Sequence, residues 1–179
     1  MNTRLQLACV FVCLAGVAGA QEVAQAAIPR LATIPLFTID WNITSNVVHY
    51  DARMKDGRMD PKEPVIAYWV MNQTDGHHEG LTLIEKLKAY GFSVKPGSAP
   101  DTYEMVIVSV KRKTLRIGRI DDQLRVTTSI GNCASAFLDH VRVQAHKWHL
   151  LNIADYADML GTDMASGAEC RERITYNER

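Results

Sequence analysis

Strict alternation of apolar and polar residues marks the clearest strand in this chain. Over residues 123–130, the apolar side chains of Leu124, Val126 and Ile130 alternate with polar ones. Because successive side chains of a strand point to opposite faces, this pattern is typical of a strand with one buried and one solvated face. Two further segments, 65–71 and 105–110, are apolar on both phases, which predicts strands that are covered on both faces.

Shorter patterns raise the number of predicted strands to about eight. The additional segments are 36–39, 46–50, 115–117, 137–145 and 169–174. Residues 150–160 fit either the face of a helix or a strand that ends at Gly161. Asp139 falls among the apolar positions of 137–145, and we expect it at the open end of that strand, because a buried carboxylate needs a partner. The pattern predicts a mainly β fold, an antiparallel β-sandwich or small barrel.

One α-helix is predicted at about residues 82–90, packed against the sheet. Thr82 and, three residues later, Glu85 form a capping-box pattern. Gly91 stands where a left-handed C-terminal cap belongs. Apolar side chains recur at helical spacing at four positions, which are Leu83, Ile84, Leu87 and Tyr90. Because the helix is short, we expect this face to be buried, with tertiary packing holding the helix in place.

The first twenty residues have the pattern of a secretory signal peptide. Arg4 precedes an apolar stretch over 5–17, and Ala18-Gly19-Ala20 forms an A-x-A cleavage site. The apolar stretch is shorter than the roughly 20 residues that a membrane-spanning helix needs. We therefore expect cleavage after Ala20, a loosely ordered leader over 21–35 and a single β-rich domain over 36–176. The protein should be exported to the periplasm or the extracellular space.

Charge argues against several classes of partner. The full chain has 20 basic and 20 acidic residues, and it loses one basic residue, Arg4, with the signal peptide. This near-neutral balance argues against a nucleic-acid partner and against electrostatic attachment of the whole protein to anionic membranes. No second apolar run is long enough for a membrane span, so we expect a soluble mature protein.

Two of the four cysteines remain after the predicted cleavage. Cys9 and Cys13 lie in the signal peptide, whereas Cys133 and Cys170 lie in the domain. An even count in an oxidising compartment favours a Cys133–Cys170 disulfide. The alternative is a pair of unrelated buried thiols.

Several segments resemble the domain-of-unknown-function family 4833. The first half of the resemblance is carried by residues 46–51, Pro64-Val65 with Tyr68-Trp69, and residues 81–85 with 89–91. Ile130-Gly131-Asn132 and residues 156–163 resemble it more loosely, and the whole covers roughly 36–174. The resemblance implies a compact secreted or periplasmic domain and favours a strand at 156–160. It supplies no activity and no catalytic residues.

A first candidate site lies on the strand at 46–50 and its extension. His49, Asp51 and Arg53 share one strand phase, so their side chains can face the same side. His49 and Asp51 together could exchange a proton with a ligand, and Arg53 could bind an anion. Trp69, on the next predicted strand, could border this site. The alternative is a polar face that pairs only with neighbouring strands.

A second candidate site is the loop that contains His77 and His78. Imidazole side chains suit zinc, copper or nickel, and both rings can reach one ion if the loop bends. The alternative is a solvated polar loop. The chain has no G-x-S-x-G, phosphate-loop, dinucleotide or H-E-x-x-H motif.

These patterns favour a non-enzymatic binding or envelope-associated role. We expect no cofactor, and the partner would be a small ligand or a component of the cell envelope. One alternative is a secreted hydrolase or metal-dependent enzyme that uses His49 and Asp51 or the His77-His78 loop. Another is a structural partner protein without a small-molecule site.

Overall fold

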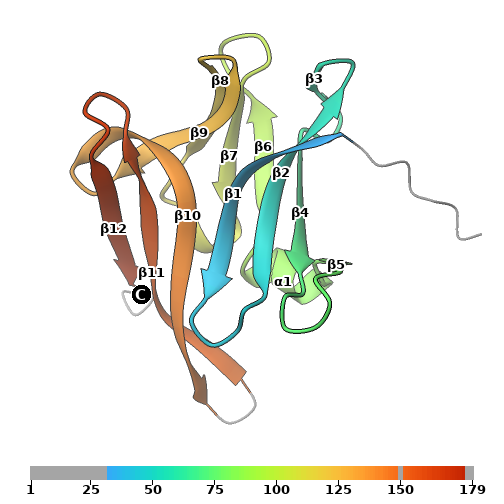
Figure 1. The fold of residues 1–179 in the computed structure, drawn as a ribbon, viewed down its shortest axis with the longest axis vertical. Coiled ribbons are helices and arrows are strands. Elements are labelled where there is room, and N and C mark those ends of the chain that lie inside the picture. The colour runs from blue at the N-terminus through green and yellow to red at the C-terminus, as the bar shows by residue number, and fades with distance from the viewer. Residues whose placement is uncertain (1–31, 149–150, 176–179) are drawn as a thin grey trace, which may run out of the picture. The chain divides into compact units, whose positions relative to one another are not determined.

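The computed structural model describes residues 32–148 and 151–175, which form a curled sheet of twelve strands with one short α-helix (Figure 1). The predicted mainly β fold class is confirmed. The predicted signal peptide, with Cys9 and Cys13, and most of the predicted leader lie outside the described residues. Cleavage after Ala20 therefore stays a prediction. Within the described residues, no helix combines the length and apolar composition needed to cross a membrane.

The strands follow one another with short connections. Their bounds are β1 Thr33–Trp41, β2 Val47–Lys55, β3 Arg58–Met59, β4 Val65–Val70, β5 His78–Gly80, β6 Phe92–Pro96, β7 Tyr103–Ile107, β8 Leu115–Ile120, β9 Gln123–Ile130, β10 Cys133–Trp148, β11 Leu151–Asp163 and β12 Glu169–Thr175. Helix α1, Leu83–Lys88, separates β5 from β6, and a 3₁₀ turn, η1, covers Val108–Val110. The described part of the ambiguous segment, 151–160, is therefore a strand, whereas the last three residues of the predicted strand 105–110 form η1.

The sheet is mixed and open. Its order is β5-β4-β2-β1-β10-β9-β8-β7-β6, and β11 and β12 extend it from β10. All pairs are antiparallel except β1 and β10, which run parallel with Ile39 opposite Val141. The sequence had suggested an antiparallel sheet, but this one parallel pair makes the sheet mixed. The two edge strands of this order are β5 and β6, and α1 connects them along the chain. The sheet curls into the form of a half-barrel (Figure 1).

The inner face of the curled sheet carries the core. Tyr50 of β2 is fully buried, stacks on Phe37 of β1 with ring centroids 4.5 Å apart, and meets the edge of Phe92. Its hydroxyl donates a hydrogen bond of 2.7 Å to the backbone carbonyl of Tyr90. This contact ties β2 to the segment that follows α1.

Helix α1 has the predicted start but not the predicted packing. Thr82 caps the helix and makes the reciprocal capping box with Glu85. Leu83, Ile84 and Leu87, however, are 72%, 74% and 61% exposed, so the expectation that they pack against the sheet is wrong. Tyr90 is buried, but it lies beyond the end of the helix. Six residues make fewer than two turns, so the chain has already left the helical phase at this tyrosine.

Gly91 is required for a different reason from the one predicted. Its φ is not among the positive values found in the described residues, so it is not a left-handed cap. A Cβ at this position would lie 1.8 Å from the carbonyl oxygen of Lys86. Only glycine permits this approach of the chain to the last turn of α1.

A β-bulge in β10 explains the odd position of Asp139. The register between β10 and β11 shifts between Leu138 and His140. As a result, Leu138 on one side of the bulge and Val141 on the other both face the core, while Asp139 is exposed and accepts a hydrogen bond from Thr162. Asp139 therefore lies inside a long strand and not at an open end.

Candidate functional site

The alternation of β2 separates two sets of side chains. Val48, Tyr50 and Ala52 are buried on the inner face, whereas His49 and Asp51 lie on the opposite, outer face. The predicted shared face of His49 and Asp51 is thus present. Tyr68 of β4 stands directly opposite His49 in the register.

Asp51 is an unusual feature of the outer face. It is only 3% exposed, and its Oδ2 accepts a hydrogen bond of 2.7 Å from the Tyr68 hydroxyl. Its Oδ1 is buried without a hydrogen-bond partner among the described residues. Burial, together with the hydrogen bond to Asp51, raises the pKa of Tyr68 well above its usual value. Tyr68 therefore stays protonated and remains a donor to this carboxylate.

Two histidines flank Tyr68 and complete an outer-face cluster of His49, Asp51, Tyr68 and His78. The Tyr68 ring stacks on His49 with centroids 5.7 Å apart and on His78 with centroids 4.6 Å apart. Burial lowers the pKa of His49, although Asp51 acts in the opposite direction. His49 is therefore neutral at neutral pH and is suited to accept or share a proton.

Arg53 and Trp69 are not part of this cluster. Arg53 forms ion pairs with Asp60 and Glu63, although its buried Nε makes no hydrogen bond among the described residues. Trp69 pairs with Val48 in the register, so it lies on the inner face. Its indole Nε1 donates a hydrogen bond of 3.0 Å to Glu85, which links β4 to α1. Trp69 therefore does not border His49 and Asp51.

The two histidines of the predicted metal loop have different partners. The ring of His77 contacts Asp75, and this hydrogen bond lowers the pKa of Asp75 to about 2. His78 stacks on Tyr68 instead. Metal binding by the pair stays a prediction.

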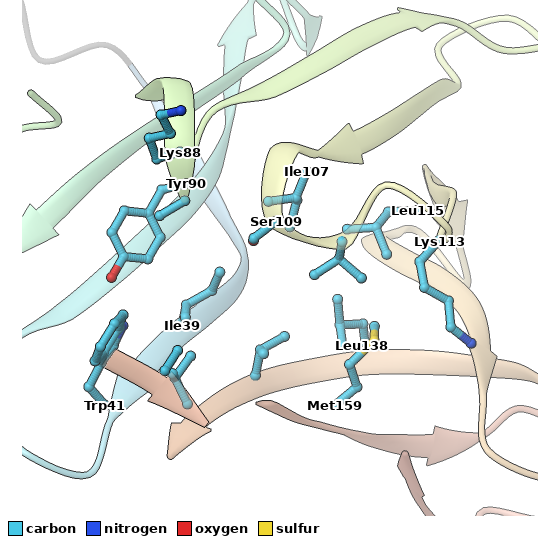
Figure 2. Close-up of a pocket in the computed structure, with 15 residues that line it drawn as sticks. Ile39, Trp41, Lys88, Tyr90, Ile107, Ser109, Lys113, Leu115, Leu138 and Met159 are labelled. Carbon is cyan, nitrogen blue, oxygen red and sulfur yellow. The ribbon is translucent and has the colours of Figure 1, made fainter. Parts of the chain in front are cut away.

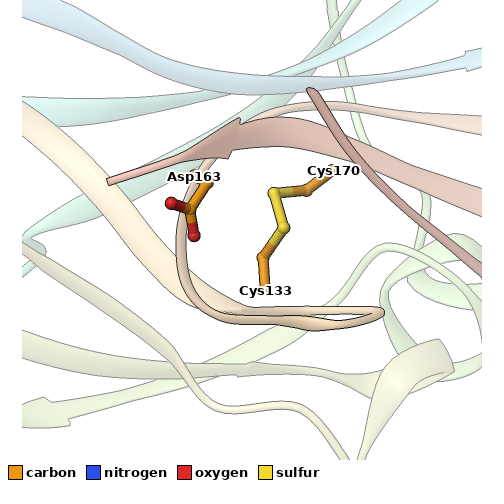
Figure 3. A group of neighbouring side chains, drawn as sticks. All are labelled: Cys133, Asp163 and Cys170. Carbon is orange, nitrogen blue, oxygen red and sulfur yellow. A yellow bond between two sulfur atoms is a disulfide. The ribbon is translucent and has the colours of Figure 1, made fainter. Parts of the chain in front are cut away.

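One other cluster has the residue types of a metal site. Cys133, Asp163 and Cys170 bring their ligand atoms within 4.8 Å of one another (Figure 3). Cys133 and Cys170, however, form the predicted disulfide, with Cα atoms 6.2 Å apart. The sulfur atoms are bonded to each other and offer no thiolate, so this cluster does not bind a metal as it stands.

An apolar cavity lies on the inner face, where the sequence analysis had placed only core. A cavity of about 220 Å³ lies between β1, β10 and β11 on one side and α1, η1 and β8 on the other (Figure 2). Twelve of its fifteen lining residues are apolar or aromatic: Ile39, Trp41, Ala89, Tyr90, Ile107, Val110, Leu115, Leu138, Val141, Val143, Ala154 and Met159. The other three are Lys88, Ser109 and Lys113. None of the lining residues is acidic.

Lys88 and Lys113 lie at the rim of the cavity, with their amino groups directed away from its apolar centre (Figure 2). Lys113 is engaged, because its Nζ lies 2.6 Å from Glu172. Lys88 is exposed and has no ion-pair partner among the described residues. Lys88 therefore lies both on the lining of the cavity and on the exposed surface at the end of α1.

Trp41 supplies a polar atom near the same end of the cavity. Its indole Nε1 is buried and has no hydrogen-bond acceptor among the described residues. The Trp41 ring meets the edge of Tyr90, which is two residues from Lys88. A buried donor without an acceptor lowers stability by about 1–3 kcal/mol, so a ligand atom that accepts this hydrogen bond would recover that energy.

The cavity was not predicted, because its residues carry no distinguishing sequence signal. Ile39, Leu138 and Val141 read as ordinary core positions of strands, and a strand pattern cannot reveal whether the space between core side chains is filled. The outer-face cluster was predicted in part. Tyr68 lies on the next predicted strand, and His78 was expected only in a separate metal loop. That both meet His49 and Asp51 was detectable only from the strand register.

Comparison with known proteins gives one result. A family model described as Domain of unknown function (DUF4833) matches residues 37–173. This match confirms the resemblance seen in residues 46–51 and 81–91. No curated protein and no solved structure matches the chain.

Proposed function

We propose that this chain, which belongs to the family described as Domain of unknown function (DUF4833), is an exported binding protein for a ligand with a slender apolar chain and an anionic head group. The single observation that carries the proposal is the cavity, which is apolar along its walls and basic at its rim. Binding sites for small ligands commonly combine mostly apolar walls with a few placed polar groups.

The walls select the apolar part of the ligand. No acidic group lines the cavity, and the neutral polar groups of its lining residues are limited to those of Ser109, Tyr90 and Trp41. A buried polar group without a partner is unfavourable, so a hydrocarbon chain suits these walls better than a sugar or a peptide. The volume of about 220 Å³ lies below the roughly 300 Å³ at which drug-sized sites begin, which favours a slender chain over a ring system.

The rim selects the head group. Lys88 offers a cation that no described carboxylate neutralises, and Trp41, which also lines the cavity, carries an indole Nε1–H without a described acceptor. Both interactions favour an anion with acceptor oxygens, such as a carboxylate. The disulfide supports an exported location, because such bonds persist in oxidising compartments.

Binding is tested with decanoate as the probe. Calorimetric titration should show saturable binding of decanoate, weaker binding of 1-decanol and the weakest binding of decyltrimethylammonium, whose charge Lys88 repels. Ala154→Phe places a ring in the cavity and should weaken decanoate binding about tenfold or more, since the walls then have no room for the chain.

A matched variant keeps this test specific. Ala165→Phe adds the same ring to an exposed residue of the β11–β12 connection and should leave the affinity unchanged. Equal decanoate affinity in the two variants, or no binding by the unaltered protein, would contradict the proposal.

A further inference from the structure

The described residues expose five large apolar side chains, and three of them are gathered on one helix. Leu83, Ile84 and Leu87 of α1 are more than 60% exposed, whereas Ile153 and Met164 are exposed singly and far less. Isolated exposed apolar residues are ordinary, but a contiguous group marks an interaction surface. We name Leu83, Ile84 and Leu87, together with Lys86 and Lys88, the α1 patch.

We propose that the α1 patch docks the protein on an anionic lipid bilayer, from which the cavity takes its ligand. This inference rests on the proposed function for the identity of the ligand, but the docking itself has a separate observable. The near-neutral charge of the whole chain argues against attachment through net charge, so the local surface has to supply the attraction.

Charge around the patch is complementary to an anionic surface. Lys86 and Lys88 lie in the last turn of α1 beside the exposed leucines. Glu85, in the first turn, is the only acidic residue of the helix. Its carboxylate accepts hydrogen bonds from the neutral groups of Trp69 and Thr82 and keeps its charge, so the two lysines give α1 one net positive charge. Lys111 and Arg112 are also exposed and directly follow η1, whose Val108 donates a hydrogen bond to the Gly91 carbonyl next to the helix. Apolar side chains flanked by cations are typical of segments that lie at the bilayer interface.

Position also favours a bilayer over other occupants. Lys88 belongs both to the α1 patch and to the lining of the cavity, so the exposed helix and the cavity are adjacent (Figure 2). A molecule with an apolar chain and an anionic head is concentrated in membranes. A protein that docks beside its own cavity could take up such a molecule without releasing its chain into water.

Vesicle flotation tests the docking with the full exported chain. The unaltered protein should float with phosphatidylcholine vesicles that contain about a third of phosphatidylglycerol, and less with phosphatidylcholine alone. The triple variant Leu83→Ser, Ile84→Ser, Leu87→Ser should partition at least tenfold less, because the exposed side chains no longer enter the interface. Lys86→Gln should lower partitioning on the anionic vesicles about fivefold.

Matched variants exclude general effects on the surface. Ile153→Ser with Met164→Ser removes the other exposed apolar side chains, and Lys55→Gln removes an exposed cation of the β2–β3 hairpin. Both should float like the unaltered protein. Flotation of the triple variant at the unaltered level would overturn the proposal, as would absence of flotation by the unaltered protein. If the unaltered protein is a dimer that does not bind vesicles and the triple variant is a monomer, the patch instead contacts a second copy of the chain.

Decanoate titration without vesicles separates the two proposals. The triple variant leaves the cavity walls intact and should bind decanoate like the unaltered protein. If the triple variant floats less than the unaltered protein but neither protein binds decanoate, the docking surface exists and the proposed ligand is wrong.

Discussion

At the scale of single residues, unpartnered polar atoms distinguish this molecule. Asp51 on the outer face and Trp41 on the cavity side each retain a buried atom with no partner among the described residues. Such atoms are rare in folded proteins, because each lowers stability. The two lie on opposite faces of the sheet and therefore have separate explanations. Trp41 belongs to the cavity, whereas Asp51 is held by Tyr68 within the outer-face cluster.

The role of Trp41 is tested by Trp41→Phe. The indole Nε1 makes no hydrogen bond among the described residues, so its removal breaks none. The free energy of unfolding should therefore not fall by the value of a hydrogen bond. Affinity for decanoate should fall about tenfold, since a hydrogen bond to a charged group is lost. Urea melts and calorimetry measure the two effects. Lower stability with unchanged affinity would assign this donor to folding rather than to ligand binding.

Asp158 predicts how stability depends on pH. Hydrogen bonds from Arg173, together with one from Arg171, hold the pKa of this buried carboxylate at about 2 although burial opposes them. A lowered pKa in the folded state contributes stability that is present above the ordinary pKa near 3.8 and is lost as the pH falls toward 2.

Asp158→Asn should therefore lower the free energy of unfolding by about 2 kcal/mol at pH 7. The difference from the unaltered protein should shrink between about pH 4 and pH 2, where the native carboxylate also becomes neutral. Urea melts across this range measure it. Asp122→Asn, in an exposed turn where asparagine adopts the same positive φ, is the control and should change little. A pH-independent difference for Asp158→Asn would contradict this assignment.

At the scale of elements, sequence periodicity predicted strands well and packing poorly. The alternation over 123–130 and the capping box at Thr82 both appear in the structure. The bulge at Asp139 was not detectable, because one extra residue in a strand changes the phase without leaving a local signal. The exposure of α1 was not detectable either, since apolar spacing shows which face a helix offers but not whether anything covers it.

Substitutions in helix α1 test directly whether its apolar face is buried or exposed. If Leu87 were buried against the sheet, Leu87→Ala would lower the free energy of unfolding by about 2–5 kcal/mol. Because the side chain is 61% exposed, we expect a change within about 0.5 kcal/mol. Thr82→Ala removes the capping box and should lower stability by about 1 kcal/mol. Denaturant midpoints that rank the two variants in the opposite order would show that the leucine is covered.

At the scale of the whole molecule, the curl of the sheet shapes the cavity, and the disulfide joins β10 to β12. The pairing of Cys133 with Cys170 was predictable from their number and from the predicted export. The half-barrel was predictable only as a class, because the parallel contact of β1 with β10 joins segments about a hundred residues apart. That contact forms one wall of the cavity, which explains why the cavity could not be inferred from any local pattern.

The disulfide should contribute strongly to stability. Its cysteines are 37 positions apart, and closing a loop of this length stabilises the fold by about 4 kcal/mol in the chain-entropy model. The double variant Cys133→Ala, Cys170→Ala should therefore have a much lower urea midpoint than the unaltered protein. The unaltered protein under reducing conditions should match the double variant. Equal midpoints in oxidised and reduced protein would contradict a structural role for the bond.

The most direct test of the binding function is to locate decanoate by methyl NMR. Titration of methyl-labelled protein should shift the resonances of residues that line the cavity, namely Ile39, Ile107, Leu138, Val143 and Met159. Ile66 on the outer face of β4 and Leu83 on the exposed helix should keep their chemical shifts. Saturable shifts confined to the cavity methyls would support the account. Unchanged cavity methyls at saturating decanoate, or shifts centred on Ile66, would contradict it.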